Sequence, residues 1–178
     1  MERIWAPWRM AYINRDEAKD DEECFLCAYP RRHDDETTMI LARGEHCFVV
    51  MNLFPYNPGH LMIAPYQHVP SIEDLDSAVL TEMMLLTQRM LAALRDAMHP
   101  EGFNMGINQG RIAGAGLADH IHFHVVPRWN GDTNFMPVLG DVRVMPELLA
   151  STYQKIRAAL RPLPDSSQAD EGASESGR

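Results

Sequence analysis

The chain has 178 residues, 46% of them hydrophobic and 23% charged, a composition typical of one globular domain with its own core. The formal net charge of −9 excludes a general nucleic-acid-binding surface, because no excess of Lys and Arg is present to displace counterions from phosphates. No apolar run approaches the ~20 residues of a membrane span and no charged-then-apolar leader opens the chain, so we expect a cytoplasmic protein without a membrane partner.

The first 23 residues are predicted to precede the main domain. Trp5-Ala6-Pro7-Trp8-Arg9 places two tryptophans in an opening arm, and because a loose terminus rarely contains tryptophan, we expect this arm to pack onto the body or a second subunit. The acidic run 16–23 is predicted to be a solvated connection. Cys24-Phe25-Leu26-Cys27 then opens a domain predicted over 24–162, with a spacing that suits a metal or a redox couple rather than a secreted disulfide framework.

Short strands are predicted next. Residues 37–42 and 47–51 favour β-structure and are joined by a predicted hairpin turn at Arg43-Gly44-Glu45-His46. Residues 52–60 form a predicted loop that contains two prolines and a glycine. Residues 61–64 predict a further strand.

One long amphipathic helix is predicted from about residue 77 to residue 98. Pro100, two residues later, is expected to end it. Ser71-Ile72-Glu73-Asp74 has the pattern of a helix start with Ser71 as the N-cap, so we expect a short helical turn before the long helix. Apolar side chains recur at helical spacing at Met83, Leu86, Met90 and Leu94. We interpret the methionines as core residues rather than as a cofactor-binding box.

The second half of the chain predicts two strands and a closing helix. Residues 103–109 alternate weakly, and the glycine-rich segment 110–116 separates them from a histidine-rich strand. Pro146 is predicted to begin a helix that ends near Arg161, and the tail 163–178 is predicted to be disordered. This order of elements predicts an α+β fold with an antiparallel sheet, not the βαβ alternation of a Rossmann fold.

Residues 119–129 (DHIHFHVVPRW) alternate three histidines with apolar residues. Because successive side chains of a strand point to opposite faces, His120, His122 and His124 are predicted to share one face. Neighbouring histidines would lie about 7 Å apart and the outer pair about 13 Å apart. This spacing favours a central nucleophile with flanking helpers over a three-histidine metal site. The alternative is a strand whose polar face happens to be rich in histidine.

His122 is the candidate nucleophile for phosphate chemistry. A neutral imidazole is a competent nucleophile near pH 7 and can form a covalent intermediate. His124 and His60 could donate hydrogen bonds to phosphoryl oxygens, and backbone N–H groups of Gly114-Ala115-Gly116 could form an anion-holding concavity. An ordinary structural histidine at position 60 and a plain turn at the glycines are the competing interpretations.

His120-Ile121-His122-Phe123-His124-Val125-Val126 resembles the His-φ-His-φ-His-φ-φ signature of the histidine triad (HIT) superfamily, where φ is apolar. Asn52, Pro58-Gly59-His60 and Gln109-Gly110 extend the resemblance over most of residues 24–129. The opening arm and the run from Pro127 also resemble the bacterial branch of diadenosine tetraphosphate (Ap4A) hydrolases and phosphorylases. The resemblance implies a HIT-like antiparallel sheet with one long helix and a C-terminal helix.

The resemblance also implies a nucleotide substrate and a role for each matching residue. His122 would attack the α-phosphate of an Ap4A-type dinucleoside polyphosphate, and water or inorganic phosphate would then release the nucleotidyl-histidine. His124 and His60 match positions near the phosphate, and Gln109 matches one near the bridging or leaving oxygen. Asn52 matches the position that holds the ribose hydroxyls, where many relatives carry Asp; an amide can both donate and accept.

Other residues bear on the choice of substrate. Val50 and Met62 could touch the base, with strand core as the competing interpretation. Relatives often have Gly-Gln-Ser where this chain has Ala115-Gly116-Leu117, so a side chain that could contact phosphate is replaced by backbone N–H groups. A nucleoside phosphoramidase or nucleotidyl transferase using the same histidine, and a non-enzymatic nucleotide-binding module, are the alternative functions.

Cys24 and Cys27 would supply half of a tetrahedral zinc site, and the resemblance implies His68 and His120 as the other ligands. The competing candidates are His33, His46 and Cys47. A zinc ion would have a structural role, anchoring the N-terminal segment onto the histidine strand; a metal-free pair of reduced thiols is the alternative. The resemblance and the tryptophan-rich arm together lead us to expect a homodimer or a larger homo-oligomer.

Overall fold

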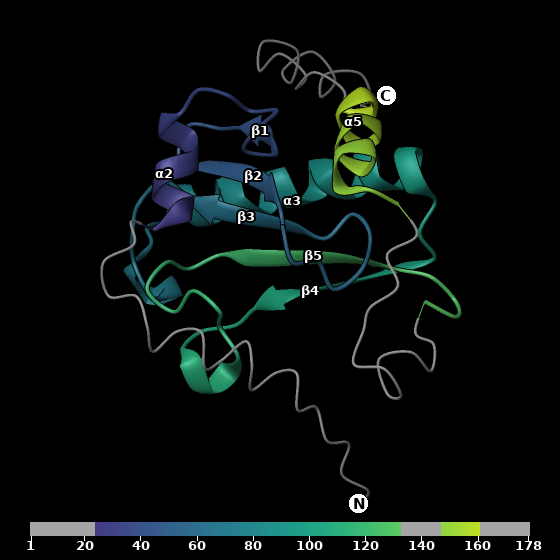
Figure 1. Ribbon diagram of the computed structural model, residues 1–178. Helices are drawn as coiled ribbons and strands as arrows, with labels where there is room; N and C mark the ends of the chain where they lie inside the picture. The colour runs from purple at the N-terminus through teal and green to yellow at the C-terminus, as the bar shows by residue number, and fades with distance from the viewer. Residues whose placement is uncertain (1–23, 133–146, 161–178) are drawn as a thin grey trace, which may run out of the picture.

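A computed structural model describes residues 24–132 and 147–160 of the chain (Figure 1). The predicted N-terminal arm, the acidic connection and the predicted disordered tail (163–178) lie outside the described residues. The closing helix, predicted to begin at Pro146, begins instead at Leu149, because Leu148 is extended. Among the helices that the structure describes, none is long and apolar enough to cross a membrane.

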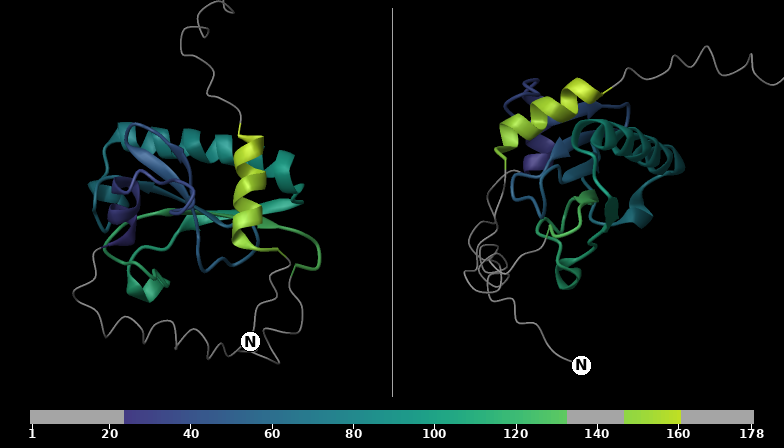
Figure 2. Two further views of the ribbon diagram at one scale, coloured as in Figure 1. Left: turned by 45° about the horizontal axis from the view of Figure 1, so that its top comes forward. Right: turned by 90° about the vertical axis from the view of Figure 1, so that its right-hand side faces the viewer.

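The described residues form an antiparallel sheet with helices against both faces, which confirms the predicted α+β fold (Figures 1 and 2). The strands are β1 (Ile40–Arg43), β2 (Cys47–Met51), β3 (Leu61–Pro65), β4 (Gly102–Ile107) and β5 (Phe123–Arg128). The helices are α2 (Phe25–Arg31), α3 (Ser77–Met98) and α5 (Leu149–Ala159), with short turns of 3-10 helix at η2 (Ile72–Asp74) and η3 (Arg111–Ala113). The strand order β1-β2-β3-β5-β4 places β4 at one edge of the sheet.

The long helix α3 has the predicted bounds, and its N-cap is Asp76. The Asp76 carboxylate accepts hydrogen bonds from the N–H groups of Ala78 and Val79, each at 3.0 Å, and so satisfies two backbone donors of the first turn. Ser71 is at the N-cap position of η2, the short turn expected before the helix.

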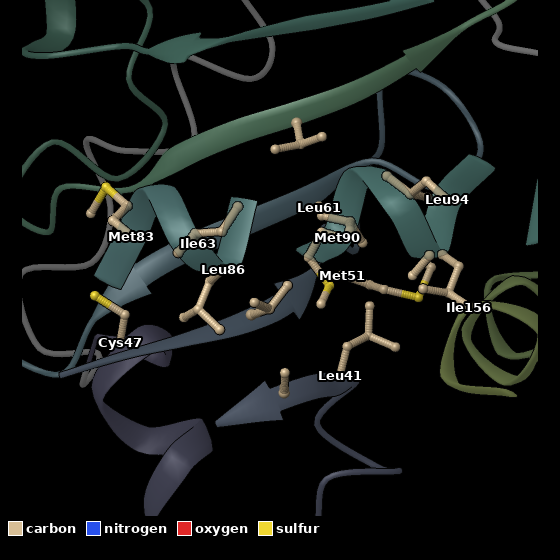
Figure 3. Packing of buried hydrophobic residues seen from close by; sticks show 14 of the residues in the cluster. Leu41, Cys47, Met51, Leu61, Ile63, Met83, Leu86, Met90, Leu94 and Ile156 are labelled. Carbon is tan, nitrogen blue, oxygen red and sulfur yellow. The ribbon is translucent and has the colours of Figure 1, made fainter. Parts of the chain in front are cut away.

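The main core lies between the sheet, α3 and α5, which crosses α3 (Figure 2). The predicted core methionines Met83 and Met90 are buried there. Figure 3 shows them on the same side of α3 as Leu86, close to Leu61 and Ile63 of β3. The helical spacing of these apolar residues is therefore the pattern of a helix packed on a sheet.

A smaller cluster covers the opposite face of the sheet, where Leu26 of α2 packs against Val50 and Met62. Val50 is fully buried and Met62 is 4% exposed, so both lie in the strand core, as their competing interpretation predicted. Met62 is directly opposite His124 in the antiparallel register. Because opposite residues of an antiparallel pair share a face, His124 lies on this side of the sheet and not on the side of α3.

The predicted hairpin turn is confirmed and docks onto α3. The N–H group of Gly44 donates to the carbonyl of Cys47 at 2.8 Å. The Glu82 carboxylate of α3 accepts hydrogen bonds from the N–H groups of Glu45, His46 and Cys47 at 2.6–2.7 Å. A single carboxylate thus joins the turn to the helix that covers the sheet.

The N-terminal part of the domain differs from the sequence-based expectation. The sequence does not predict α2, which is short, contains Pro30 and depends on burying Leu26 against the sheet rather than on intrinsic propensity. The strand expected at 37–42 begins at Ile40. The residues just before it form a turn, in which the Thr38 hydroxyl donates to the Asp34 carbonyl at 2.6 Å.

The histidine-rich strand is also shorter than predicted. β5 begins at Phe123, so His120 and His122 lie in the segment that leads into it. The N–H group of Ile121 donates to the carbonyl of Val69 at 2.7 Å, which draws this segment away from the strand ladder. The first two histidines are therefore free of the strict alternation that a strand would impose.

Candidate functional site

The structure brings His60, His122 and His124 into one cluster. The ring centroids of His122 and His124 are 4.7 Å apart, and those of His60 and His124 are 5.1 Å apart. The rings are closer than the about 7 Å expected along a strand, because the side chains converge and His60 arrives from a different loop. The ring of His120 does not join this cluster and points toward the cysteines instead.

The 52–60 loop delivers His60 as a fully buried side chain. The N–H group of Asn52 donates to the carbonyl of His60 at 3.0 Å, and the N–H group of His60 donates to the carbonyl of Asn57 at 3.1 Å. Gly59 adopts φ +75°, and a Cβ there would lie 2.8 Å from Sδ of Met98. Glycine suits this approach of the loop to the end of α3, because it adopts the positive φ without strain and has no Cβ to displace the Met98 side chain.

The backbone fixes the tautomer of His122, which is 6% exposed. Its Nδ1 lies 2.9 Å from the carbonyl oxygen of His120. Because a carbonyl oxygen can only accept, Nδ1 carries the hydrogen and donates it. Nε2 of the neutral ring then has the free lone pair that a nucleophile needs.

The tautomer of His60 is set by the backbone, and it in turn sets the tautomer of His124. Nδ1 of His60 accepts from the N–H group of Tyr56 at 3.1 Å, so the hydrogen of the neutral ring is on Nε2. That Nε2 lies 3.0 Å from Nδ1 of His124 and donates to it. Consequently His124 carries its own hydrogen on Nε2, where it can be donated to another group.

Burial favours the neutral forms of the His122 and His124 rings. It lowers the pKa of His124 to about 4, with a further contribution from neighbouring His122. Burial also lowers the pKa of His122, against the opposing effect of its hydrogen bond to the His120 carbonyl. One uncharged ring with a free lone pair therefore lies beside another with a free N–H donor.

Asn52 contacts this cluster through its amide. Its Oδ1 accepts from the N–H group of Phe54 at 2.9 Å, and its Nδ2 lies 3.3 Å from Nδ1 of His60. An amide nitrogen can only donate, so Asn52 favours the same His60 tautomer as Tyr56 does. An aspartate at this position would offer no such donor.

Gln109 is placed differently from the expectation. Its Oε1 accepts from the N–H group of Ile72 at 3.1 Å, and its Nε2 donates to Ser71 at 2.8 Å and to Glu73 at 3.0 Å. The amide is thus engaged by the η2 turn and not by the histidines. A role at a leaving oxygen would require these contacts to open.

The glycine-rich segment forms a turn. The N–H group of Gly114 donates to the carbonyl of Arg111 at 3.0 Å, and that of Ala115 donates to the carbonyl of Gly110 at 3.3 Å. These two groups are used inside the η3 turn, so for them the structure supports the plain-turn interpretation. Of the three N–H groups expected to hold an anion, the one that these turn contacts leave is that of Gly116.

A second cluster lies at the other end of the histidine segment. Cys24, Cys27, His68 and His120 offer ligand atoms that all lie within 4.8 Å of one another. Sγ of Cys24 and Nδ1 of His120 are 3.3 Å apart, as are Sγ of Cys27 and Nδ1 of His68. Tetrahedral zinc with bonds of about 2.0–2.3 Å separates its ligands by about 3.3–3.8 Å, so the spacing and the donor set both fit zinc.

The second ring nitrogen of His120 strengthens this fit. Nε2 lies 2.9 Å from the carbonyl oxygen of Pro65 and must donate to it, which leaves the Nδ1 lone pair directed at the thiols. Metal-binding histidines commonly donate their other N–H group in this way. Burial also lowers the pKa of His120 to about 4, so the ring is neutral, as a metal ligand must be.

The competing metal ligands do not join this cluster. The Cys47 thiol is buried in the main core and contacts the Val79 carbonyl at 3.7 Å. Burial raises its pKa to about 12, which disfavours the thiolate that binds metal. His33 and His46 lie outside the group of four residues that the described part of the chain brings together.

Tyr56 is a contributor that sequence reasoning missed. Besides its N–H contact, its ring centroid lies 4.7 Å from that of His60 and 6.0 Å from that of His124. The sequence does show an aromatic residue in the loop that ends at His60. A backbone N–H contact, however, is available to almost any residue type and leaves no mark on the sequence.

Comparison with known proteins gives the same picture. The family model described as HIT domain matches residues 34–131. A Mycobacterium tuberculosis protein named AP-4-A phosphorylase is 41% identical over 157 residues, covering 85% of this chain and 80% of that protein. A Dictyostelium discoideum protein named bis(5'-adenosyl)-triphosphatase is 32% identical over 84 residues, covering 47% of this chain and 56% of that protein.

Solved structures share the fold. A Zn-bound histidine triad family protein from Mycobacterium smegmatis superposes with a TM-score of 0.63 at 28% identity, covering 78% of this chain and 93% of that one. A Hit-like protein from Bartonella henselae also has a TM-score of 0.63, at 22% identity, covering 80% of this chain and 99% of that one.

Proposed function

This chain belongs to the HIT domain family, and from that premise we propose that it cleaves dinucleoside polyphosphates of the Ap4A type through His122. The observation that carries the proposal is the pair of complementary tautomers, with a lone pair at Nε2 of His122 and a hydrogen at Nε2 of His124. The similarity to an AP-4-A phosphorylase over most of both chains supports the substrate class.

In the proposed reaction, Nε2 of His122 bonds to the α-phosphorus as the P–O bond to the departing nucleoside polyphosphate breaks. The His122 ring becomes cationic, and the His120 carbonyl stabilises that charge through the Nδ1–H group. His124 stabilises a phosphoryl oxygen through its Nε2–H group. His60 supports that donor, because its own Nε2–H group is donated to Nδ1 of His124. Attack by the acceptor on phosphorus then breaks the N–P bond and returns His122 to its neutral state.

The acceptor in the second step is water or inorganic phosphate. Phosphate would convert Ap4A into ATP and ADP, whereas water would give ATP and AMP. The relative named as a phosphorylase supports phosphate. The histidines do not themselves discriminate between the two acceptors, because both attack the same phosphorus.

We assign nucleotide contacts on the same basis. Asn52, next to His60, would bind the ribose hydroxyls, and the buried side chains of Val50 and Met62 would form an apolar floor below the base rather than an open contact surface. The N–H group of Gly116 would face the phosphates. Gln109 would reach the leaving oxygen after releasing the η2 turn.

We propose that Cys24, Cys27, His68 and His120 hold a structural zinc ion. Bound zinc would supply a crosslink between α2, the end of β3 and the histidine segment, with no open coordination position for chemistry. The donor set, its spacing and the His120–Pro65 hydrogen bond support the proposal. The Zn-bound relative of known structure is consistent with it.

We further propose a homodimer in the cytoplasm. The position of β4 at the sheet edge supports a dimer, because an edge strand has backbone groups available for pairing with a second copy. The exposed Met105 on this strand would be covered in such a pairing. Reduced zinc thiolates suit a reducing compartment. Sedimentation equilibrium of the full chain would test the dimer.

Incubation of Ap4A with and without phosphate tests the function directly. ATP and ADP formed only with phosphate would establish phosphorolysis, and ATP and AMP formed without phosphate would establish hydrolysis. A protein that cleaves a nucleoside phosphoramidate but not Ap4A would move the assignment to that alternative. Nucleotide binding without any turnover would identify a non-enzymatic module.

A further inference from the structure

The carboxylate of Asp132 lies outside the histidine cluster but accepts hydrogen bonds from three residues of two segments, the end of β5 and the 52–60 loop. It accepts from Nε of Arg128 at 2.6 Å and from Nη2 of Arg128 at 2.9 Å. It also accepts from the Asn57 side chain at 2.7 Å and from the N–H group of Trp129 at 3.2 Å. The Asp132 side chain is 10% exposed and that of Arg128 is 43% exposed, so solvent partly screens the ion pair while the carboxylate itself is largely enclosed.

The arginine end of this network is anchored in the sheet. Arg128 is the last residue of β5, and its Nη1 donates to Oδ1 of Asn104 on β4 at 2.6 Å. Asp132 is thus held against two paired strands by a bidentate guanidinium contact. Such a contact fixes direction as well as distance.

The Asn57 end of the network lies in the loop that carries His60. Nδ2 of Asn57 donates to Asp132 and also to the carbonyl of Pro127 at 3.1 Å. The Asn57 carbonyl accepts from the N–H group of His60 at 3.1 Å. One residue therefore joins the sheet, through its side chain, to the backbone of the buried histidine.

We infer that Asp132 is a positioning residue that acts through Asn57 to hold His60 against His124. The contact that it secures is the 3.0 Å hydrogen bond from Nε2 of His60 to Nδ1 of His124, which places the His124 hydrogen on Nε2. The expected effect on kcat rests on the proposed function, whereas the expected effect on the His124 tautomer does not.

Loss of the Asp132 carboxylate would hold the 52–60 loop less firmly but would leave the histidine cluster assembled. The Asn57 amide would keep its contact with the Pro127 carbonyl, so the loop would shift rather than detach. A misplacement of about 1 Å can cost about 100-fold in rate, and a weakened donor would let the His124 ring populate both tautomers. Substrate binding at Asn52 would change much less than turnover.

The test compares Asp132→Asn with Asp35→Asn in the full chain. Asp35 also pairs with an arginine, Arg43, whose Nη2 and Nε donate to the single oxygen Oδ1 at 2.7 and 3.0 Å. That pair connects β1 to the turn before it and not to the 52–60 loop. It is therefore a matched control for loss of an Arg–Asp contact. The measurements are kcat and KM for Ap4A, thermal stability, and ring 15N chemical shifts of the histidines.

We expect Asp132→Asn to lower kcat by about 10- to 100-fold, with KM changed less than about 3-fold and the His124 ring shifts moved toward a tautomer mixture. Asp35→Asn should change neither kcat nor the shifts. Asn57→Ala should reproduce the effect. The Asn57→Ala/Asp132→Asn double variant should lose no more kcat than either single variant, because both substitutions interrupt the same connection from Asp132 through Asn57 to His60.

Unchanged ring shifts and kcat in a folded Asp132→Asn protein would overturn the inference, as would an equal loss in Asp35→Asn. Additive losses in the double variant would also contradict it. If the wild-type protein shows no cleavage that depends on His122, the proposed function fails instead. The 15N shifts then still test the positioning role, because they need no turnover.

Discussion

Nδ1 of His122 lies 2.9 Å from the carbonyl oxygen of His120. His120 therefore contacts the cysteines through its ring and the candidate nucleophile, His122, through its backbone. The two clusters are therefore mechanically connected through one residue. A metal that fixes the His120 ring would also fix the carbonyl that orients His122.

This connection predicts that loss of the metal impairs turnover as well as stability. We expect Cys24→Ser to lower the zinc content well below one ion per chain and to reduce kcat, because the His120 backbone loses its anchor. Elemental analysis and thermal unfolding of protein purified without chelators are the measurements. Cys47→Ala, which alters a core thiol, should retain the metal. Wild-type protein that contains no zinc would contradict the proposal.

Replacement of the candidate nucleophile should separate turnover from binding. We expect His122→Asn to reduce Ap4A cleavage by about 10³-fold or more while nucleotide affinity changes little, because the asparagine retains a polar side chain but has no ring nitrogen to bond phosphorus. Quenched wild-type reactions should contain a nucleotidyl adduct on His122, detectable by mass spectrometry. His33→Asn, at an exposed position, should behave as the wild type. Full activity of His122→Asn would refute the mechanism.

His124 predicts a specific dependence of stability on pH. Its folded-state pKa of about 4 lies below the ordinary value of 6.5, so between these values the unfolded chain binds the proton more readily than the folded one. The free energy of unfolding should therefore fall as pH decreases from about 6.5 toward about 4, where the contribution levels off. Urea unfolding across this range should show a shallower dependence for His124→Asn. An identical slope in both proteins would exclude His124 as the source.

Gly59 should resist substitution because of both its conformation and its surroundings. A Cβ at φ +75° would lie 2.8 Å from Sδ of Met98 and 3.3 Å from Cγ of Pro127. We expect Gly59→Ala to lower the free energy of unfolding by about 1–3 kcal/mol and to reduce kcat by displacing His60. Gly102→Ala is the control, since no atom lies within 4 Å of its added Cβ. Equal stability of the two variants would contradict the steric argument.

Several features of the fold could be predicted from local sequence pattern. The bounds of α3 follow from the spacing of its apolar residues, and the hairpin before β2 follows from its turn residues. The family signature indicated that His60, His122 and His124 belong to one site, and it supplied His68 and His120 as partners for the cysteines. The predictions of α3 and of the hairpin are confirmed because periodicity and turn chemistry are properties of neighbouring residues. The structure brings the members of both residue sets close together, while their roles stay predictions.

Tertiary structure determined the rest. The tautomers of the histidines depend on backbone groups of Tyr56 and His120 that meet them only in the folded chain. The amide of Gln109 is taken up by a turn 36–38 residues away in sequence, and Asp132 reaches the site through a loop 75 residues before it. Residue type limits which hydrogen bonds a side chain can form, but the direction and distance of its partners are set when distant segments pack together.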